Sequence, residues 1–253
     1  MTATILVTGG TGTLGRLVLP LLRDAGANVR VLSRHGHEPA DGLDYVTGDL
    51  LKDEGIEAAV NGAETVLHLA GSPKGDDVAT RNLMAAAARA GVQHLVYISV
   101  TAADRIPLGY FKAKLGAEQA VIESGVPWTT LRAAQFHDLG LTVSKAMAKM
   151  PVVPIPGGMR MQPVDAREVA TRLVELTLDK PAGRVPDLVG PTVYGMRDLV
   201  GGYLRATGKR RLMMPVRMPG KAGRVYRAGE NLSLDGAEVG KLTWEAFLAE
   251  KLG

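Results

Sequence analysis

The sequence contains no cysteine. This absence excludes disulfides, thiolate metal sites and a cysteine nucleophile, and it fits a reducing compartment. Any redox chemistry must therefore come from a bound cofactor.

No apolar run approaches the roughly 18 residues that a membrane-spanning helix needs, and the chain enters a strand-like segment without the basic start of a signal peptide. We expect a cytoplasmic protein with no membrane partner.

Acidic residues are missing from one long stretch. Between Asp198 and Glu230 there are eight basic residues and no aspartate or glutamate: Arg205, Lys209, Arg210, Arg211, Arg217, Lys221, Arg224 and Arg227. Such a stretch can attract nucleic acid, but its only aromatic residues are Tyr203 and Tyr226, and most basic stretches are solvated surface. We therefore expect no nucleic-acid partner.

No histidine has a second ligand at metal spacing, so we predict no metal site.

Short β-branched runs alternate with longer helical stretches, and this alternation is typical of a parallel sheet with helices on both faces. The pattern predicts strands over residues 3–7, 28–33, 66–69, 94–99 and 128–132, and helices over 14–25, 77–90 and 110–124. Gly26, Gly91 and Gly125 each follow a helix, where a left-handed cap is favoured. The predicted fold class is α/β, a Rossmann-type doubly wound parallel sheet.

After residue 132 the alternation of strand-like and helical segments becomes less regular. Helices are expected over residues 139–150, 165–178, 198–207 and 244–252, and a proline-broken segment covers 151–156. We interpret 1–253 as a single dinucleotide-binding domain in which about 136–253 contributes a small C-terminal substrate lobe.

A glycine motif, TGGTGTLG, lies between the first strand and the first helix. Gly9 permits a tight turn, Gly12 lets the backbone approach a pyrophosphate, and Gly15 lets the helix pack on the strand. The amides at the helix start then face the phosphates. The motif predicts a dinucleotide site that also includes Thr11, Thr13 and Leu14; the alternative is a glycine-rich turn alone.

The end of the second strand selects between the two nicotinamide cofactors. An acid there would bind the ribose 2′-hydroxyl of NAD(H), whereas this chain has Ser33 and Arg34, a hydroxyl and a cation suited to a 2′-phosphate. This favours NADP(H), with NAD(H) less expected. In the alternative interpretation Arg34 is a solvated loop residue.

These segments resemble the atypical short-chain dehydrogenase/reductases and, among them, the NmrA-like NAD(P)H-binding proteins. The matching pieces occur in the family's order: TGGTGTLG, Gly48-Asp49-Leu50, LHLAG at 67–71, VYIS at 96–99, YFKAK at 110–114, LRAAQF at 131–136 and PVDAREVA at 163–170. The resemblance implies cofactor contacts by Asp49 and Leu50 near the adenine, Leu69, Ala70 and Gly71 beside the adenosine half, and Ala133, Ala134, Gln135 and Phe136 near the nicotinamide. Asp49 could also serve as a turn or helix cap.

Tyr110 and Lys114 stand four apart on a predicted helix and so share one face. In short-chain reductases this YxxxK spacing pairs a phenol that protonates the reduced carbonyl with an ammonium that lowers the pKa of the phenol and holds the ribose. Ser99 and Thr101 are equal candidates for the accompanying hydroxyl. The alternative is a packed tyrosine beside a solvated lysine.

The preferred hypothesis is an NADPH-dependent reductase of a small apolar carbonyl or quinone, acting as a monomer or homodimer. Hydride would come from the nicotinamide, Tyr110 would supply the proton, and Ser99 or Thr101 would polarise the oxygen. A second hypothesis is a non-catalytic NADP(H)-binding redox sensor, and a third is a nucleotide-sugar epimerase or dehydratase. His137 could protonate the substrate or line its pocket.

Overall fold

The computed structural model describes residues 4–36, 42–72 and 74–253, so residue 3, expected to begin the first strand, lies outside the described residues. The chain divides into two compact units. The first comprises the residues up to Ser99 together with Gly109–Leu131 and Val169–Val185; the second comprises Val100–Leu108, Arg132–Glu168 and Pro186–Gly253. The chain therefore enters the second unit and returns to the first twice before its final segment, which belongs to the second unit.

A parallel sheet organises the first unit, in the strand order β6-β5-β4-β1-β2-β3, with β9 beside β6. Its strands are β1 (Thr4–Thr8), β2 (Asn28–Ser33), β3 (Leu43–Thr47), β4 (Thr65–His68), β5 (His94–Val100), β6 (Trp128–Ala133) and β9 (Gly183–Arg184). Every residue of β5 is buried, as expected of a strand in a parallel sheet that is covered on both faces.

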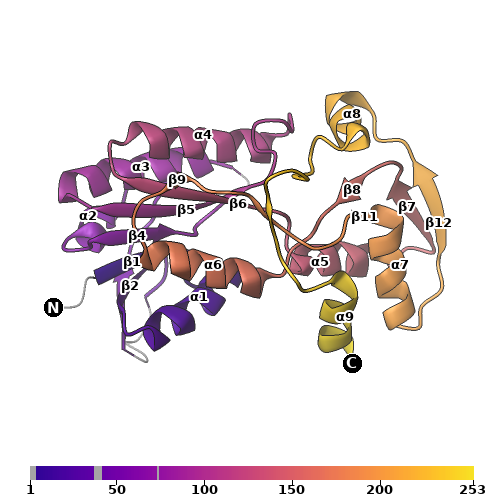
Figure 1. Ribbon diagram of the computed structural model, residues 1–253, viewed down its shortest axis with the longest axis horizontal. Helices are drawn as coiled ribbons and strands as arrows, with labels where there is room; N and C mark the ends of the chain where they lie inside the picture. Colours follow the sequence, from indigo (N-terminus) through magenta and orange to yellow (C-terminus); the bar gives the residue numbers. More distant parts are fainter. Residues whose placement is uncertain (1–3, 37–41, 73) are drawn as a thin grey trace. The chain divides into compact units, whose positions relative to one another are not determined.

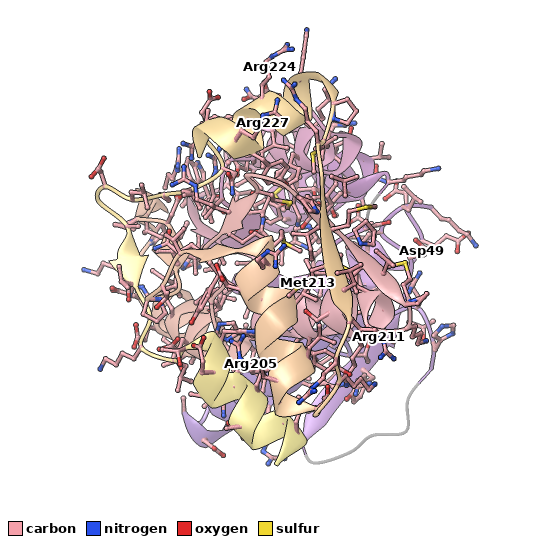
Figure 2. All side chains as sticks on the ribbon, turned by 90° about the vertical axis from the view of Figure 1, so that its right-hand side faces the viewer. Asp49, Arg205, Arg211, Met213, Arg224 and Arg227 are labelled. Carbon is pink, nitrogen blue, oxygen red and sulfur yellow. The ribbon has the colours of Figure 1, made fainter. Side chains whose placement is uncertain are left out.

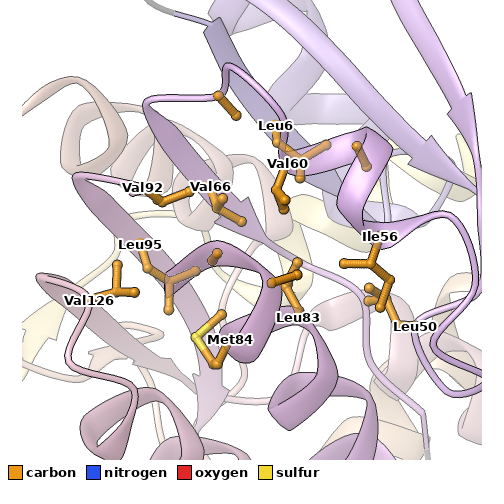
Figure 3. Packing of buried hydrophobic residues seen from close by; sticks show 14 of the residues in the cluster. Leu6, Leu50, Ile56, Val60, Val66, Leu83, Met84, Val92, Leu95 and Val126 are labelled. Atoms are coloured by element: carbon orange, nitrogen blue, oxygen red, sulfur yellow. The ribbon is translucent and has the colours of Figure 1, made fainter. Parts of the chain in front are cut away.

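Helices cover both faces of this sheet. They are α1 (Thr13–Asp24), α2 (Ile56–Val60), α3 (Asp76–Ala90), α4 (Gly109–Glu123) and most of α6 (Ala166–Leu178). α2, α3 and α4 lie on one face, and α1 and α6 on the other (Figure 1). Between the sheet and α2–α3 lies a buried apolar cluster that includes Leu6, Val60, Leu83 and Leu95 (Figure 3). Burial of these side chains is the main driving force for the layered packing.

The second unit is built from short strands and helices: α5 (His137–Met147), β7 (Val152–Pro156), β8 (Arg160–Met161), β10 (Leu188–Val189), β11 (Tyr194–Gly195), α7 (Met196–Ala206), β12 (Leu212–Val216), α8 (Gly220–Ala228), β13 (Glu238–Val239) and α9 (Trp244–Leu252). β7 pairs with β12 in parallel, and β8 pairs with β11 antiparallel. The core of this unit centres on the fully buried Trp244, whose indole Nε1 donates to the carbonyl of Leu199 at 3.1 Å.

The structure confirms the predicted doubly wound parallel sheet, with element ends shifted by a residue or two in the first unit. Gly26, Gly91 and Gly125 have positive φ angles, as expected. The sequence analysis missed β3, α2, β12 and α8, and also the two-residue strands β8, β9, β10, β11 and β13. The proline-broken segment 151–156 contains a regular strand, β7; its prolines are tolerated because each strand of a two-stranded sheet has one edge that donates no ladder hydrogen bonds.

Candidate functional site

The glycine turn after β1 leaves no room beside the backbone for a side chain at two of the three glycines that define the motif, Gly9 and Gly15. A Cβ added to Gly9, whose φ is +73°, would lie 2.6 Å from the backbone nitrogen of Ala70. A Cβ on Gly15 would lie 2.3 Å from the carbonyl oxygen of Gly10. The turn closes through a 3.0 Å hydrogen bond from the Gly12 amide to the Gly9 carbonyl. The positive φ of Gly9 suits the predicted tight turn, whereas the close contact at Gly15 is with the turn itself and not with a strand.

The start of α1 suits an anion. Its N-cap is Gly12, no side chain caps its first amides, and the first turn contains no acid. Thr11, Gly12 and Thr13 are exposed at this turn, whereas Leu14 and Gly15 are buried in the packing below it. Backbone amides at a helix start favour negative charge, so the exposed part of the turn can receive phosphate groups.

Cations lie on both sides of the glycine turn. At the end of β2, Ser33 is buried and its hydroxyl accepts from the His35 amide at 3.3 Å, while Arg34 is exposed. On α1, Arg16 and Arg23 line an open pocket of about 340 Å³ next to the turn. The sequence analysis missed these two arginines. Their spacing of seven residues puts them on one helix face, a signal that could have indicated them.

The turn after β3 gives Asp49 a structural role. Its amide and carbonyl exchange hydrogen bonds of 2.8 and 3.0 Å with Glu54, and its carboxylate accepts from the amides of Leu51 at 2.9 Å and Lys52 at 3.4 Å. Leu50 is buried in the apolar core. The alternative interpretation of Asp49 as a turn residue therefore holds, and it does not exclude a ligand contact.

A histidine joins the ends of β1 and β4. The His68 Nδ1 lies 2.6 Å from the Thr8 hydroxyl, and its Nε2 lies 3.0 Å from the Thr80 hydroxyl. The Thr8 hydroxyl also accepts from the Ala70 amide at 3.2 Å, and the Leu69 amide donates to the Thr8 carbonyl at 3.1 Å. Full burial lowers the pKa of His68 to about 4, so the ring is neutral at neutral pH. These contacts fix the loop that continues through Gly71.

Lys114 lies in a buried polar cluster that the sequence analysis did not foresee. Its ammonium is 3.1 Å from the Asp76 carboxylate, and it donates to the Tyr97 hydroxyl and the Ile98 carbonyl, each at 3.2 Å. The Tyr97 hydroxyl donates to Asp76 at 3.3 Å. Asp76, Tyr97 and Lys114 are all buried. A Cβ on Gly71 would lie 3.3 Å from the ammonium, so this glycine keeps the approach to Lys114 open.

Tyr110 is four residues before Lys114 on α4, as predicted, but it does not share the buried environment of the lysine. Its side chain is 40% exposed, and its ring packs edge-on against Phe111. Partial burial, together with the negative charge of Asp76, raises the pKa of Tyr110. This corrects the expected lowering: the charge of Lys114 is compensated by Asp76, so it does not favour the phenolate.

The two candidate hydroxyls differ in their surroundings. The buried Ser99 donates to the carboxylate of the buried Glu118 at 2.5 Å. Thr101 is buried in the second unit, where its amide donates to the carbonyl of Ala133 at 3.0 Å. Because the Ser99 proton is held by a carboxylate, Ser99 has no proton to donate to a substrate oxygen in this arrangement.

The segment after β6 is fixed by backbone contacts of the second unit. Ala133 and Ala134 are buried, and the Ala134 amide donates to the carbonyl of Leu188 at 2.9 Å. The Gln135 carbonyl accepts from the Val164 amide at 3.0 Å, and Phe136 forms a bridge with the same residue. Gln135 and Phe136 are the half-buried positions of this segment.

His137 does not line a solvent-accessible pocket. It is fully buried, its ring lies against Trp244 and Phe247, and its Nδ1 is 3.8 Å from Asp165, beyond hydrogen-bond range. Over residues 4–36, 42–72 and 74–253, no group of three histidine, aspartate or glutamate side chains is arranged to hold a metal ion. In the same part of the chain, no helix is both long and apolar enough to span a membrane.

Comparison with known proteins gives a consistent picture. A family described as NAD(P)H-binding matches residues 9–178. The chain is 33% identical over 212 residues to the (4-alkanoyl-5-oxo-2,5-dihydrofuran-3-yl)methyl phosphate reductase of Streptomyces griseus, a match that covers 81% of this chain and 74% of that protein. It is 25% identical over 215 residues to quinone oxidoreductase 2 of Escherichia coli, covering 81% and 75%.

Solved structures share the fold. The NADPH complex of an NADPH-dependent quinone oxidoreductase from Escherichia coli superposes with a TM-score of 0.83 at 19% identity, covering 98% of this chain and 100% of that one. The triphenylmethane reductase of a Citrobacter species, complexed with NADP(H), gives a TM-score of 0.78 at 21% identity, covering 98% and 99%.

Proposed function

The chain belongs to the NAD(P)H-binding family, and from this premise we propose that it is an NADPH-dependent oxidoreductase that reduces a small apolar carbonyl or quinone. The observation that carries the proposal is the glycine turn, where a Cβ on Gly9 or Gly15 would collide with backbone and where α1 begins without a side-chain cap. Such a turn is shaped for the close approach of a pyrophosphate. The named relatives include a quinone oxidoreductase and a phosphate-bearing-lactone reductase.

The amides from Gly12 to Gly15 would hold the pyrophosphate, and Ser33 and Arg34 the 2′-phosphate. Arg16 and Arg23 supply further positive charge at the same turn. As the family resemblance implies, the adenosine half of the cofactor would be contacted by Asp49, Leu50, Leu69, Ala70 and Gly71. The nicotinamide half would be contacted by Ala133, Ala134, Gln135 and Phe136. The cofactor, when bound, supplies the hydride.

Tyr110 is the proposed proton donor. The phenol is protonated at neutral pH and can transfer its proton from Oη to the substrate oxygen once the substrate has received a hydride; its raised pKa makes it a weaker acid, and the positive charge of an oxidised nicotinamide would offset this. One hydride and one proton convert a ketone into an alcohol or a quinone into a quinol. Lys114, held by Asp76, offers a fixed ammonium to the ribose hydroxyls.

Thr101 is the better candidate for polarising the substrate oxygen. Ser99 donates its proton to Glu118, which leaves the Thr101 hydroxyl as the candidate for the substrate oxygen. A neutral hydroxyl aimed at the carbonyl oxygen stabilises the charge that develops there during reduction. We also propose that the protein is cytoplasmic and acts as a monomer or homodimer.

The cofactor preference is tested by titrating the protein with NADPH and NADH. We expect the protein to bind NADPH more tightly than NADH. Arg34→Ala should weaken NADPH binding by about tenfold, because the variant loses a charge-assisted contact with the 2′-phosphate. NADH binding should not change in the variant, because NADH has no 2′-phosphate. Equal affinities of the wild type for the two cofactors would contradict the assignment of Ser33 and Arg34.

Catalysis is tested by NADPH oxidation against a panel of quinones and aldehydes. Tyr110→Phe should lower kcat by roughly a hundredfold or more, because general acid catalysis by a positioned side chain contributes that much. Tyr203→Phe is the matched control, since this tyrosine belongs to the core of the second unit. Binding of NADPH without any turnover would favour the redox sensor, and no binding would overturn both hypotheses.

A further inference from the structure

One face of the β7–β12 sheet exposes a continuous row of apolar side chains. Leu212, Met214 and Val216 alternate along β12 and are 68%, 51% and 40% exposed. The register places them beside Val152, Pro154 and Pro156 of β7, and Val152 is 38% exposed. Successive side chains of a strand point to opposite faces, and the intervening residues Met213, Val153 and Ile155 contact the core of the second unit, whereas Pro215, beside Ile155, is exposed. We call this row, Leu212, Met214, Val216 and Val152, the apolar strip.

Cations border the apolar strip at both ends. At the Leu212 end, Lys149, Arg210 and Arg211 line an open hollow of about 520 Å³ together with Pro151 and Leu212. At the Val216 end, Arg217 and Lys221 follow in the chain and are exposed. Figure 2 looks onto β12 and shows Arg211 at one end of the strand, with Arg224 and Arg227 on α8 beyond the other end.

The hollow is preorganised for an anion. The Arg211 guanidinium is held by the carbonyl of Ala148 at 3.1 Å and by that of Arg210 at 2.8 Å. A fixed guanidinium loses little freedom when it binds a phosphate. The chain from 199 to 229 contains no acid and eight cations, so this stretch adds only positive charge around the hollow.

We propose that the apolar strip and its flanking cations dock this protein on an anionic phospholipid surface. Long apolar side chains flanked by basic residues match the boundary between acyl chains and charged headgroups. The hollow would receive a lipid phosphate, and Leu212 and Met214 would enter the acyl boundary. This proposal departs from the expectation of no membrane partner, which rested on the lack of an apolar run, because surface docking needs no spanning helix.

Charge argues against a second copy of this chain as the occupant. A two-fold interface places the same patch on both subunits, so the cations at each end of the strip would face cations of the other copy. Like charges across an interface oppose association, whereas an anionic surface compensates all of them at once.

Vesicle sedimentation tests the proposal with the intact protein. We expect sedimentation with vesicles that contain phosphatidylglycerol in phosphatidylcholine, little with phosphatidylcholine alone, and release as salt is raised, because salt screens the charge component. The double variants Arg210→Glu/Arg211→Glu and Leu212→Ser/Met214→Ser should each weaken binding by about tenfold or more. The matched control Leu178→Ser/Lys180→Glu makes the same types of change on an exposed surface of the first unit, and it should bind as the wild type does.

Three outcomes would overturn the proposal. Equal sedimentation with neutral and anionic vesicles, or none with either, would exclude anionic lipid recognition. Binding of free inorganic phosphate that fully competes with vesicles and is insensitive to the Leu212→Ser/Met214→Ser change would assign the hollow to a small anion. A dimer in analytical ultracentrifugation that the same serine variant dissociates would assign the strip to a second copy. Because all substituted side chains are exposed, far-ultraviolet circular dichroism should be unchanged, so loss of binding reports the surface.

Discussion

Two charged sites, one in each unit, hold their cations in opposite ways. In the first unit, Lys114 is buried and compensated by Asp76, with every contact made inside the protein. In the second unit, Arg210 and Arg217 are exposed in a stretch without acids. A buried charge must have a partner within the fold, because its desolvation is otherwise very costly. Exposed cations need none, so they are available to ligands from outside.

This contrast separates two ways in which charge contributes to function. The cluster around Lys114 fixes a cation at one position, which suits the orientation of a cofactor. The cations beside β12 create a field over an extended surface, which suits attraction of an anionic partner. Stability measurements can test whether this division is real.

The largest effect is expected at two adjacent residues of α3. Asp76 is buried against Lys114, whereas Asp77 forms an exposed pair with Arg81 at 2.7 Å. Asp76→Asn should lower the free energy of unfolding by about 3–5 kcal/mol, because it leaves a buried ammonium without its counterion. Asp77→Asn should cost at most about 1 kcal/mol, as exposed pairs do. Urea unfolding measures both.

Each of these variants controls the other. Both aspartates lie in the first turn of α3, so each substitution removes the same favourable interaction between a negative charge and the helix dipole. The difference between them therefore reports burial and pairing with Lys114. Equal losses would contradict the comparison between buried and exposed charge.

A smaller effect is expected from protonation of His68. Burial lowers its pKa from 6.5 to about 4, with Lys114 adding to the lowering and Asp76 opposing it. Between these two pH values the unfolded chain binds a proton and the folded chain does not, so stability falls as the pH falls. The loss grows from pH 6.5 down to about 4, amounts to about 3 kcal/mol, and then levels off.

His68→Gln tests this window. Glutamine can still hydrogen-bond to Thr8 and Thr80 but does not titrate, so urea unfolding from pH 7 to 4 should show a shallower loss of stability than in the wild type. Carboxylates contribute equally to both proteins, and the difference between the two curves isolates His68. Parallel curves would show that the ring is charged or solvated in the folded state.

The sequence predicts most of the first unit because its signals are local; the exceptions β3 and α2 are a strand without a buried face and a helix of only five residues. The turn at Gly9 and Gly15 occupies eight consecutive residues, and the strands and helices around it have clear periodicity. Lys114 was identified by its spacing from Tyr110, but its actual partner is Asp76, which precedes it by 38 residues in the chain. That contact arises from packing of α3 against α4, and no local pattern indicates it.

The second unit is harder to predict for a physical reason. β12 has its apolar residues exposed, and it contains Pro215, so neither alternation toward a core nor strand propensity indicates a strand. α8 is short and rich in glycine and arginine. In the first unit, the contact of Tyr97 with Lys114 was missed for another reason. Tyr97 lies in a fully buried strand, and a tyrosine in such a strand cannot be told from an ordinary core residue until its hydroxyl contacts are known.

The smallest effect is expected on the exposed side of the comparison. Arg210→Met and Arg217→Met should each change the free energy of unfolding by no more than about 0.5 kcal/mol, because substitutions at exposed positions away from caps and networks have little effect. Lys114→Met is the matched change at the buried site, and it should destabilise strongly by leaving Asp76 without its cation.

The measurement is urea unfolding at low salt, where repulsion between neighbouring cations is least screened. Any small change should be stabilising, because removal of one cation relieves repulsion from the others. A loss above about 1 kcal/mol at Arg210 or Arg217 would mean that the cation stabilises the second unit, and the argument that these side chains are available to an anionic surface would fail.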